Sequence, residues 1–157
     1  MTDPFIIEGP ALWSFSGGRT SAYMLWRALQ SYGGQLPDNH VVTFANTGKE
    51  REETLRFVRD CGERWGVPIV WIEYTGDTQP IRRRVREVSF ETAARNGEPF
   101  ARLIHEKQFV PNAVMRFCTT ELKVWPLRDW MLMRGYDHWT NAVGLRYDEP
   151  GRVSKVR

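Results

Sequence analysis

The chain has few cysteines and no long hydrophobic run. Its 157 residues include two cysteines, Cys61 and Cys118. Two thiols cannot supply the four ligands of a zinc site or an iron–sulfur cluster, so we expect no iron–sulfur cluster on a single chain. No apolar stretch approaches the roughly 18 residues of a membrane-spanning helix, and the N-terminus lacks the layout of a secretion signal. We therefore expect a cytoplasmic protein without membrane contact, in which a disulfide is not expected.

Internal repeats, low-complexity tracts and a second-domain boundary are also lacking. These absences predict a single domain over residues 1–157. The chain stops at Arg157 without a closing helix, which fits either a truncated protein or a short family member. The net charge of +3 is a mild surplus. It fits a nucleotide or nucleic-acid ligand, and it also fits many proteins that bind neither.

Apolar runs alternate with amphipathic patterns along the sequence. Strands are expected at residues 11–16, 40–45, 67–74 and 139–145. Helices are expected at residues 20–32, 50–65 and 119–134, with short helical segments near 89–97 and 99–108. No clear strand is expected within residues 75–118. Strands that alternate with helices predict right-handed crossovers and an α/β fold with a parallel sheet.

A glycine-bearing turn, Ser14-Phe15-Ser16-Gly17-Gly18-Arg19-Thr20-Ser21, joins the first expected strand to the first expected helix. The glycines let the backbone approach a ligand, and the first N–H groups of a helix have no partner within it. The turn matches neither the Walker pattern nor Gly-x-Gly-x-x-Gly. We interpret it as a phosphate-binding loop; the alternative is a turn that merely needs glycine. The candidate nucleotide-binding residues here are Ser14, Ser16, Gly17, Gly18, Arg19, Thr20 and Ser21.

A second polar segment, Asn46-Thr47-Gly48-Lys49-Glu50, follows the second expected strand. In open parallel sheets, ligands bind at the carboxyl ends of the strands. Asn46 and Thr47 can hydrogen-bond a base, a ribose or a phosphate, and Gly48 permits a tight turn. The alternative is a helix cap, with Glu50 favourably placed in the first helical turn.

Two further segments carry charge. In Arg116–Lys123, the cations Arg116 and Lys123 could meet phosphate or sulfate groups. An ordinary helix start with a core thiol at Cys118 is the alternative. In Gly144–Glu149, Arg146 could grip an anion, while Asp148 and Glu149 could hold Mg²⁺. Here the alternative is a solvated charged turn.

Together the four segments resemble, in the same order, motifs of the PAPS (phosphoadenylyl sulfate) reductase-like branch of the ATP pyrophosphatase (PP-loop) superfamily. The first resembles the Ser-Gly-Gly-x-x-Ser loop, and Asn46–Leu55 resembles the second motif. Cys118–Pro126 resembles Cys-x-x-x-Leu-Lys-x-x-Pro, and Gly144–Arg152 resembles Gly-x-Arg-x-x-Glu-Ser-x-x-Arg. Two residues depart from the pattern: Thr20 stands where many of these proteins have Asp, and Pro150 replaces the usual Ser.

The resemblance implies an α/β three-layer sandwich with an open, mainly parallel five-stranded sheet, of the adenine nucleotide alpha hydrolase-like type. It also implies that ATP or PAPS binds and reacts at or next to the α-phosphate. Lys123, Arg146 and Cys118 are then the candidate catalytic residues, and Mg²⁺ the candidate cofactor. The cysteine-bearing tail of true PAPS reductases is absent, so sulfonucleotide reduction and ATP-dependent sulfur transfer both stay open.

The other function class left open is a non-catalytic module that senses nucleotide or binds nucleic acid. A basic run favours it: Arg82, Arg83, Arg84 and Arg86. These arginines are equally typical of a solvated helix face. A surface that follows phosphates would lose affinity steeply with added salt, which separates the two interpretations. The sequence also leaves a homodimer open.

Overall fold

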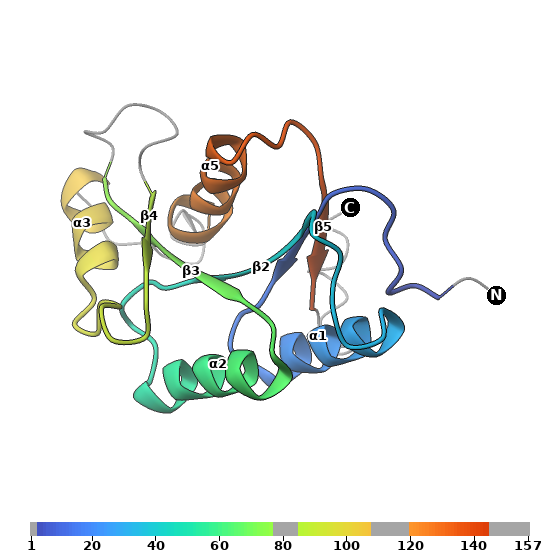
Figure 1. The fold of residues 1–157 in the computed structure, drawn as a ribbon. Coiled ribbons are helices and arrows are strands. Elements are labelled where there is room, and N and C mark those ends of the chain that lie inside the picture. Colours follow the sequence, from blue (N-terminus) through green and yellow to red (C-terminus); the bar gives the residue numbers. More distant parts are fainter. Residues whose placement is uncertain (1–2, 77–84, 108–119, 145–157) are drawn as a thin grey trace.

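The structure is a computed structural model that describes residues 3–76, 85–107 and 120–144. Its strands are β1 (Ala11–Ser14), β2 (His40–Ala45), β3 (Ile69–Tyr74), β4 (Val85–Val88) and β5 (Thr140–Val143). Its helices are α1 (Arg19–Ser31), α2 (Glu52–Trp65), α3 (Glu98–Lys107), the π-helical turn η1 (Thr120–Val124) and α5 (Trp125–Met133) (Figure 1). The predicted α/β class is confirmed. None of the helices in these ranges combines the length and apolar character that crossing a bilayer requires.

The five strands form one sheet in the order β4-β3-β2-β1-β5. The pairs β5–β1, β1–β2 and β2–β3 are parallel, and β4 runs antiparallel to β3, so the sheet is mainly parallel as predicted. The chain proceeds outward from β1 to β2 and β3, and later places β5 on the opposite side of β1. Such a reversal of strand order creates a crevice at the carboxyl ends of the strands, where open α/β sheets bind ligands.

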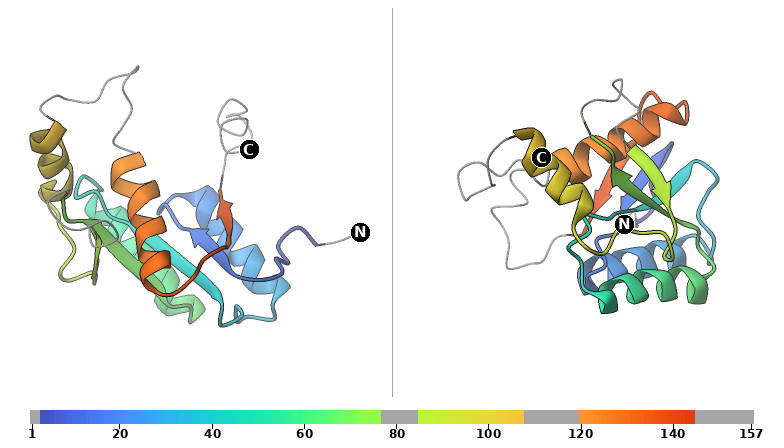
Figure 2. Two further views of the ribbon diagram at one scale, coloured as in Figure 1. Left: turned by 90° about the horizontal axis from the view of Figure 1, so that it is seen from above. Right: turned by 90° about the vertical axis from the view of Figure 1, so that its left-hand side faces the viewer.

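Alternate residues of the central strands face two separate hydrophobic cores. Trp13 and Phe44 pack in the core that α1 and α2 cover. Leu12 and Ile72 point the other way and pack in a cluster with Met131 of α5. The ribbon shows α1 and α2 side by side along one face of the sheet and α5 over the opposite face (Figures 1 and 2). Both faces of the sheet are therefore buried, as the apolar runs of the strands indicate.

The expectation that residues 75–118 contain no strand is wrong, because Val85–Val88 forms the edge strand β4. Its position depends on contacts with a distant helix. The Glu87 carboxylate accepts hydrogen bonds from Trp130 Nε1 (2.7 Å) and from Arg134. These two donors hold the pKa of Glu87 below its usual value. Residues 89–97, where a short helix was expected, form turns instead, whereas the segment near 99–108 is helical as α3.

Candidate functional site

The loop between β1 and α1 is shaped by hydrogen bonds among its own residues. Ser21 is buried, and its Oγ donates to the Gly18 carbonyl (3.1 Å) and accepts from the Ser16 N–H (3.1 Å). The Ser16 and Ser21 hydroxyls lie 3.0 Å apart. Ser21 therefore has a structural role in the loop, and a direct contact of its hydroxyl with phosphate stays a prediction. Its hydroxyl fixes the path of the backbone that the glycines make possible.

The first backbone N–H groups of α1 have no partner inside the helix. The Ala22 N–H makes the first intrahelical bond, to the Gly18 carbonyl (3.0 Å), so the amides of residues 19–21 precede it. No side chain caps the helix, and no acidic residue lies in its first turn. By contrast, two glutamates occupy the first turn of α2. The α1 terminus thus keeps the partial positive charge that favours an anion.

A pocket of about 780 Å³ opens at the carboxyl ends of β1, β2 and β5. This volume suits a small-molecule ligand. Its described lining residues come from four separate parts of the chain: Ser14, Phe15, Ser16, Gly18, Arg19 and Thr20; Thr43 and Ala45; Lys123, Val124 and Leu127; Val143 and Gly144. The first segment, Lys123 of the third and Gly144 of the fourth therefore meet at one pocket.

The end of β5 lies directly against the start of α1. A Cβ added to Gly144 would lie 3.0 Å from the backbone N and Cα of Ser21. Such a close approach requires glycine at this position, because no side chain fits between the two backbones. The fourth segment therefore begins beside the phosphate-binding loop.

Lys123 reaches the same pocket from the π-helical turn η1, which continues into α5. Single π-helical turns are rare and occur frequently at functional sites. Val124 and Val143 also line the pocket, and their side chains are 52% and 40% exposed. The pocket thus combines a cation, free amides and exposed apolar surface, a set that suits a ligand with an anionic end and an apolar body.

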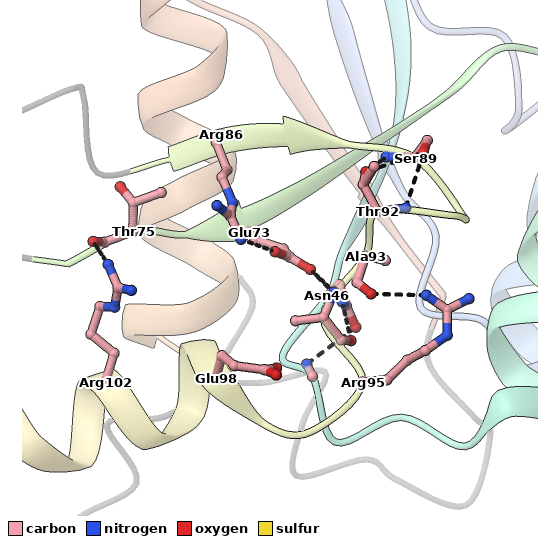
Figure 3. Close-up of polar contacts among 12 residues, drawn as sticks. Asn46, Glu73, Thr75, Arg86, Ser89, Thr92, Ala93, Arg95, Glu98 and Arg102 are labelled. Carbon is pink, nitrogen blue, oxygen red and sulfur yellow. Dashed lines mark hydrogen bonds and ion pairs between the residues drawn. The ribbon is translucent and has the colours of Figure 1, made fainter.

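Asn46 is part of a buried hydrogen-bond network. Its side chain is fully buried, and its Nδ2 donates to Glu73 Oε2 (2.6 Å) and to the Ala94 carbonyl (2.9 Å) (Figure 3). Its Oδ1 accepts from the Gly48 N–H (3.2 Å). The Asn46 amide is thus hydrogen-bonded inside the protein, and a direct contact with a nucleoside stays a prediction.

Thr47 and Gly48 shape the same turn. Thr47 Oγ1 accepts a hydrogen bond from the Lys49 N–H (3.3 Å), which matches the capping alternative. Gly48 has a φ of +84°, as the predicted tight turn requires. The second segment thus forms a hydrogen-bonded turn at the carboxyl end of β2, and its residues 46–48 are not among the described pocket residues.

Glu73 is the residue at this edge that the sequence analysis missed. It is fully buried in β3, and its carboxylate accepts from Asn46, from the Ala94 N–H (2.6 Å) and from Arg86 (3.0 Å) (Figure 3). The signal that could have found it is a carboxylate inside an otherwise apolar strand, Ile69–Tyr74. Arg86 pairs with this buried carboxylate, and its contact with nucleic acid stays a prediction.

Several predicted residues lie outside the described ranges: Arg82, Arg83, Arg84, Cys118, Arg146, Asp148 and Glu149. Their roles stay predictions. Within the described ranges, no group of three His, Cys, Asp or Glu side chains gathers as a metal site would require. The remaining cysteine, Cys61, is buried in the core, and this burial raises the pKa of its thiol.

Adjacent glycines in the loop are expected to respond differently to substitution. Gly17 has a φ of +83°, and a Cβ there would lie 2.6 Å from Thr54 Cγ2. Gly18 has an extended backbone, and a Cβ there would meet nothing closer than Ser16 Oγ at 3.6 Å. Gly17→Ala should therefore lower the free energy of unfolding by about 2 kcal/mol, through strain and crowding. Gly18→Ala, its matched control, should change it little. Urea denaturation measures both, and equal values would contradict the loop geometry.

Two curated relatives resemble the chain. It is 34% identical over 145 residues to the uncharacterized nin region protein ORF290 of Escherichia phage lambda, covering 89% of this chain and 49% of the phage protein. It is 28% identical over 152 residues to the uncharacterized protein MJ0066 of Methanocaldococcus jannaschii, covering 96% of this chain and 26% of that protein. The chain thus spans about half the length of the first relative and about a quarter of the second. No family model matches the chain, and no solved structure matches it significantly.

Proposed function

We propose that the chain is an adenine-nucleotide-binding enzyme of the PAPS reductase-like, ATP pyrophosphatase type. It would act at or next to the α-phosphate, in sulfur transfer or sulfonucleotide chemistry. The observation that carries the proposal is the meeting of the Ser14–Thr20 loop, Lys123 and Gly144 around one pocket at the strand ends. The helices on both faces of the mainly parallel sheet also support the three-layer, adenine nucleotide alpha hydrolase-like fold as part of this proposal.

The pocket lining combines two kinds of chemistry. At the loop, the first amides and the positive end of α1 suit the phosphates. Val124, Leu127 and Val143 line the same pocket and offer apolar surface that suits a flat heterocycle. An adenine nucleotide has these two parts, a polyanionic end and an aromatic body. This match supports a nucleotide over a free phosphate or a purely apolar ligand.

Reaction at the α-phosphate needs groups that position the nucleotide and stabilise the charge that develops on the phosphate oxygens. The loop amides would hold the phosphates in place. Lys123, which also lines the pocket, would neutralise developing charge. Thr20 stands where a carboxylate is usual, and the first turn of α1 holds no acid. Asp148 and Glu149 therefore stay the candidates for Mg²⁺, which would supply further neutralisation of the phosphates.

Lys123→Ala is expected to weaken ATP binding about tenfold, because it removes one cation from the phosphate end of the pocket. Lys49→Ala is the matched control: Lys49 is exposed, lies above the Phe100 ring and is not among the pocket residues. Calorimetry with ATP, AMP and PAPS measures the affinities. Release of pyrophosphate from ATP or of sulfite from PAPS identifies the reaction. Equal affinity of wild type and Lys123→Ala would remove Lys123 from the site, and a wild type that binds none of the three nucleotides would overturn the proposed function.

A further inference from the structure

Thr43 holds a buried hydroxyl that the sequence analysis did not single out. It lies near the end of β2, directly opposite Ser14 of β1 in the parallel pairing. Its neighbours Val42 and Phe44 pack in the core beneath α1 and α2. Because side chains alternate along a strand, Thr43 projects to the other face, where the pocket lies under η1 and α5. Thr43 is one of the residues that line this pocket.

The Thr43 side chain is only 1% exposed, and in the part of the chain that the structure describes its Oγ1 has no hydrogen-bond partner. Buried polar groups in native proteins are nearly always hydrogen-bonded, and an unpaired one destabilises the fold. A valine of the same shape would avoid this penalty. A hydroxyl kept here thus indicates a partner that arrives with the ligand.

We propose that the Thr43 hydroxyl recognises the edge of the base of the bound nucleotide, an inference that rests on the proposed function. The phosphates belong at the α1 amides, whereas Thr43 and Ala45 of β2 line the pocket together with Leu127 of α5. Among these apolar residues the flat body of a heterocycle fits, and its polar edge then needs a partner at the floor. A hydroxyl both donates and accepts, so it can pair with a ring nitrogen or an exocyclic amino group. Rotation about the Cα–Cβ bond can turn the hydroxyl between staggered positions.

The test compares wild type, Thr43→Val and Thr43→Ser, each titrated with ATP and with inorganic tripolyphosphate, which has phosphates but no base. Thr43→Val should bind ATP at least tenfold more weakly and bind tripolyphosphate unchanged. Thr43→Ser, which keeps the hydroxyl, should stay close to wild type. The melting temperature of ligand-free Thr43→Val should equal or exceed that of wild type, because no hydrogen bond of the free protein is lost.

Each other outcome has a distinct meaning. ATP binding by wild type and Thr43→Val alike would overturn the role of Thr43 and leave the proposed function standing. An equal loss for ATP and tripolyphosphate would show that Thr43 acts on the phosphates or on the fold, and would also overturn the inference. So would a lower melting temperature of the ligand-free variant, because the hydroxyl would then have a partner inside the protein. A wild type that does not bind ATP would remove the proposed function, and this inference with it.

Discussion

Gly18→Asp is expected to weaken nucleotide binding strongly without lowering stability. Gly18 is the N-cap of α1, with an exposed, extended backbone and no atom within 3.4 Å of an added Cβ. Aspartate is a favoured N-cap residue, and its charge is stabilised by the helix N-terminus. The same carboxylate would place a negative charge at the start of α1, where it would repel phosphate. Juxtaposed like charges cost several kcal/mol, so ATP affinity should fall at least about a hundredfold.

Gly18→Asn is the matched control for this substitution. Asparagine caps helices as well as aspartate does and has nearly the same shape, but it carries no charge. It should therefore keep most of the ATP affinity, with a melting temperature close to that of Gly18→Asp. Calorimetry and thermal unfolding on the three proteins separate charge from shape. Unchanged ATP binding by Gly18→Asp would show that the phosphates do not lie at the start of α1.

Glu73→Ala should lower the free energy of unfolding by about 3–5 kcal/mol, the range for removing one partner of a buried charged network. The carboxylate of Glu73 accepts hydrogen bonds from Asn46, the Ala94 N–H and Arg86. Without it, the fully buried Asn46 amide and the partly buried Ala94 N–H lose their acceptor. Such unsatisfied groups carry their full desolvation penalty, and the truncated side chain leaves a cavity as well.

Two further variants bracket the effect. Glu73→Gln keeps the volume but has one acceptor oxygen in place of two, so its loss should be smaller than that of Glu73→Ala. Glu91→Ala removes an exposed carboxylate on the segment after β4, and it should change stability by less than about 0.5 kcal/mol. Urea denaturation measures all three. A loss below about 1 kcal/mol for Glu73→Ala would contradict its place at the centre of a buried network.

The elements with strong local signals could be predicted from the sequence. The β1–α1 loop has an apolar run before it, two glycines within it and an amphipathic helix after it, and each signal operates over a few residues. β4 could not be predicted in this way. It is four residues long, with two charged side chains at its centre. Its position depends on pairing with β3 and on the contact of Glu87 with Trp130, which is 43 residues away.

In the candidate site, too, some features follow from the local sequence, whereas others depend on contacts between residues that are far apart in the sequence. The sequence correctly placed Asn46 at a strand end. An asparagine in that position can either contact a ligand or stabilise a turn through hydrogen bonds. Its partner Glu73, 27 residues further along the chain, decides which of the two it does. Thr43 lies in a run that is typical of a buried strand, so its hydroxyl gave no separate signal. Only the alternation of side chains on β2 and the location of the pocket distinguish it from a core residue.

A crystal structure with the α,β-methylene analogue of ATP, which is not cleaved between those phosphates, would locate the nucleotide on the protein. We expect its phosphates at the amides of residues 19–21, Lys123 beside them, and its base over Thr43 and Ala45. A second pocket of about 600 Å³ lies at the amino ends of β2 and β3, with Asp38 and Arg134 in its lining. A nucleotide bound there, or anywhere away from the Ser14–Thr20 loop, would contradict both the proposed site and the function built on it.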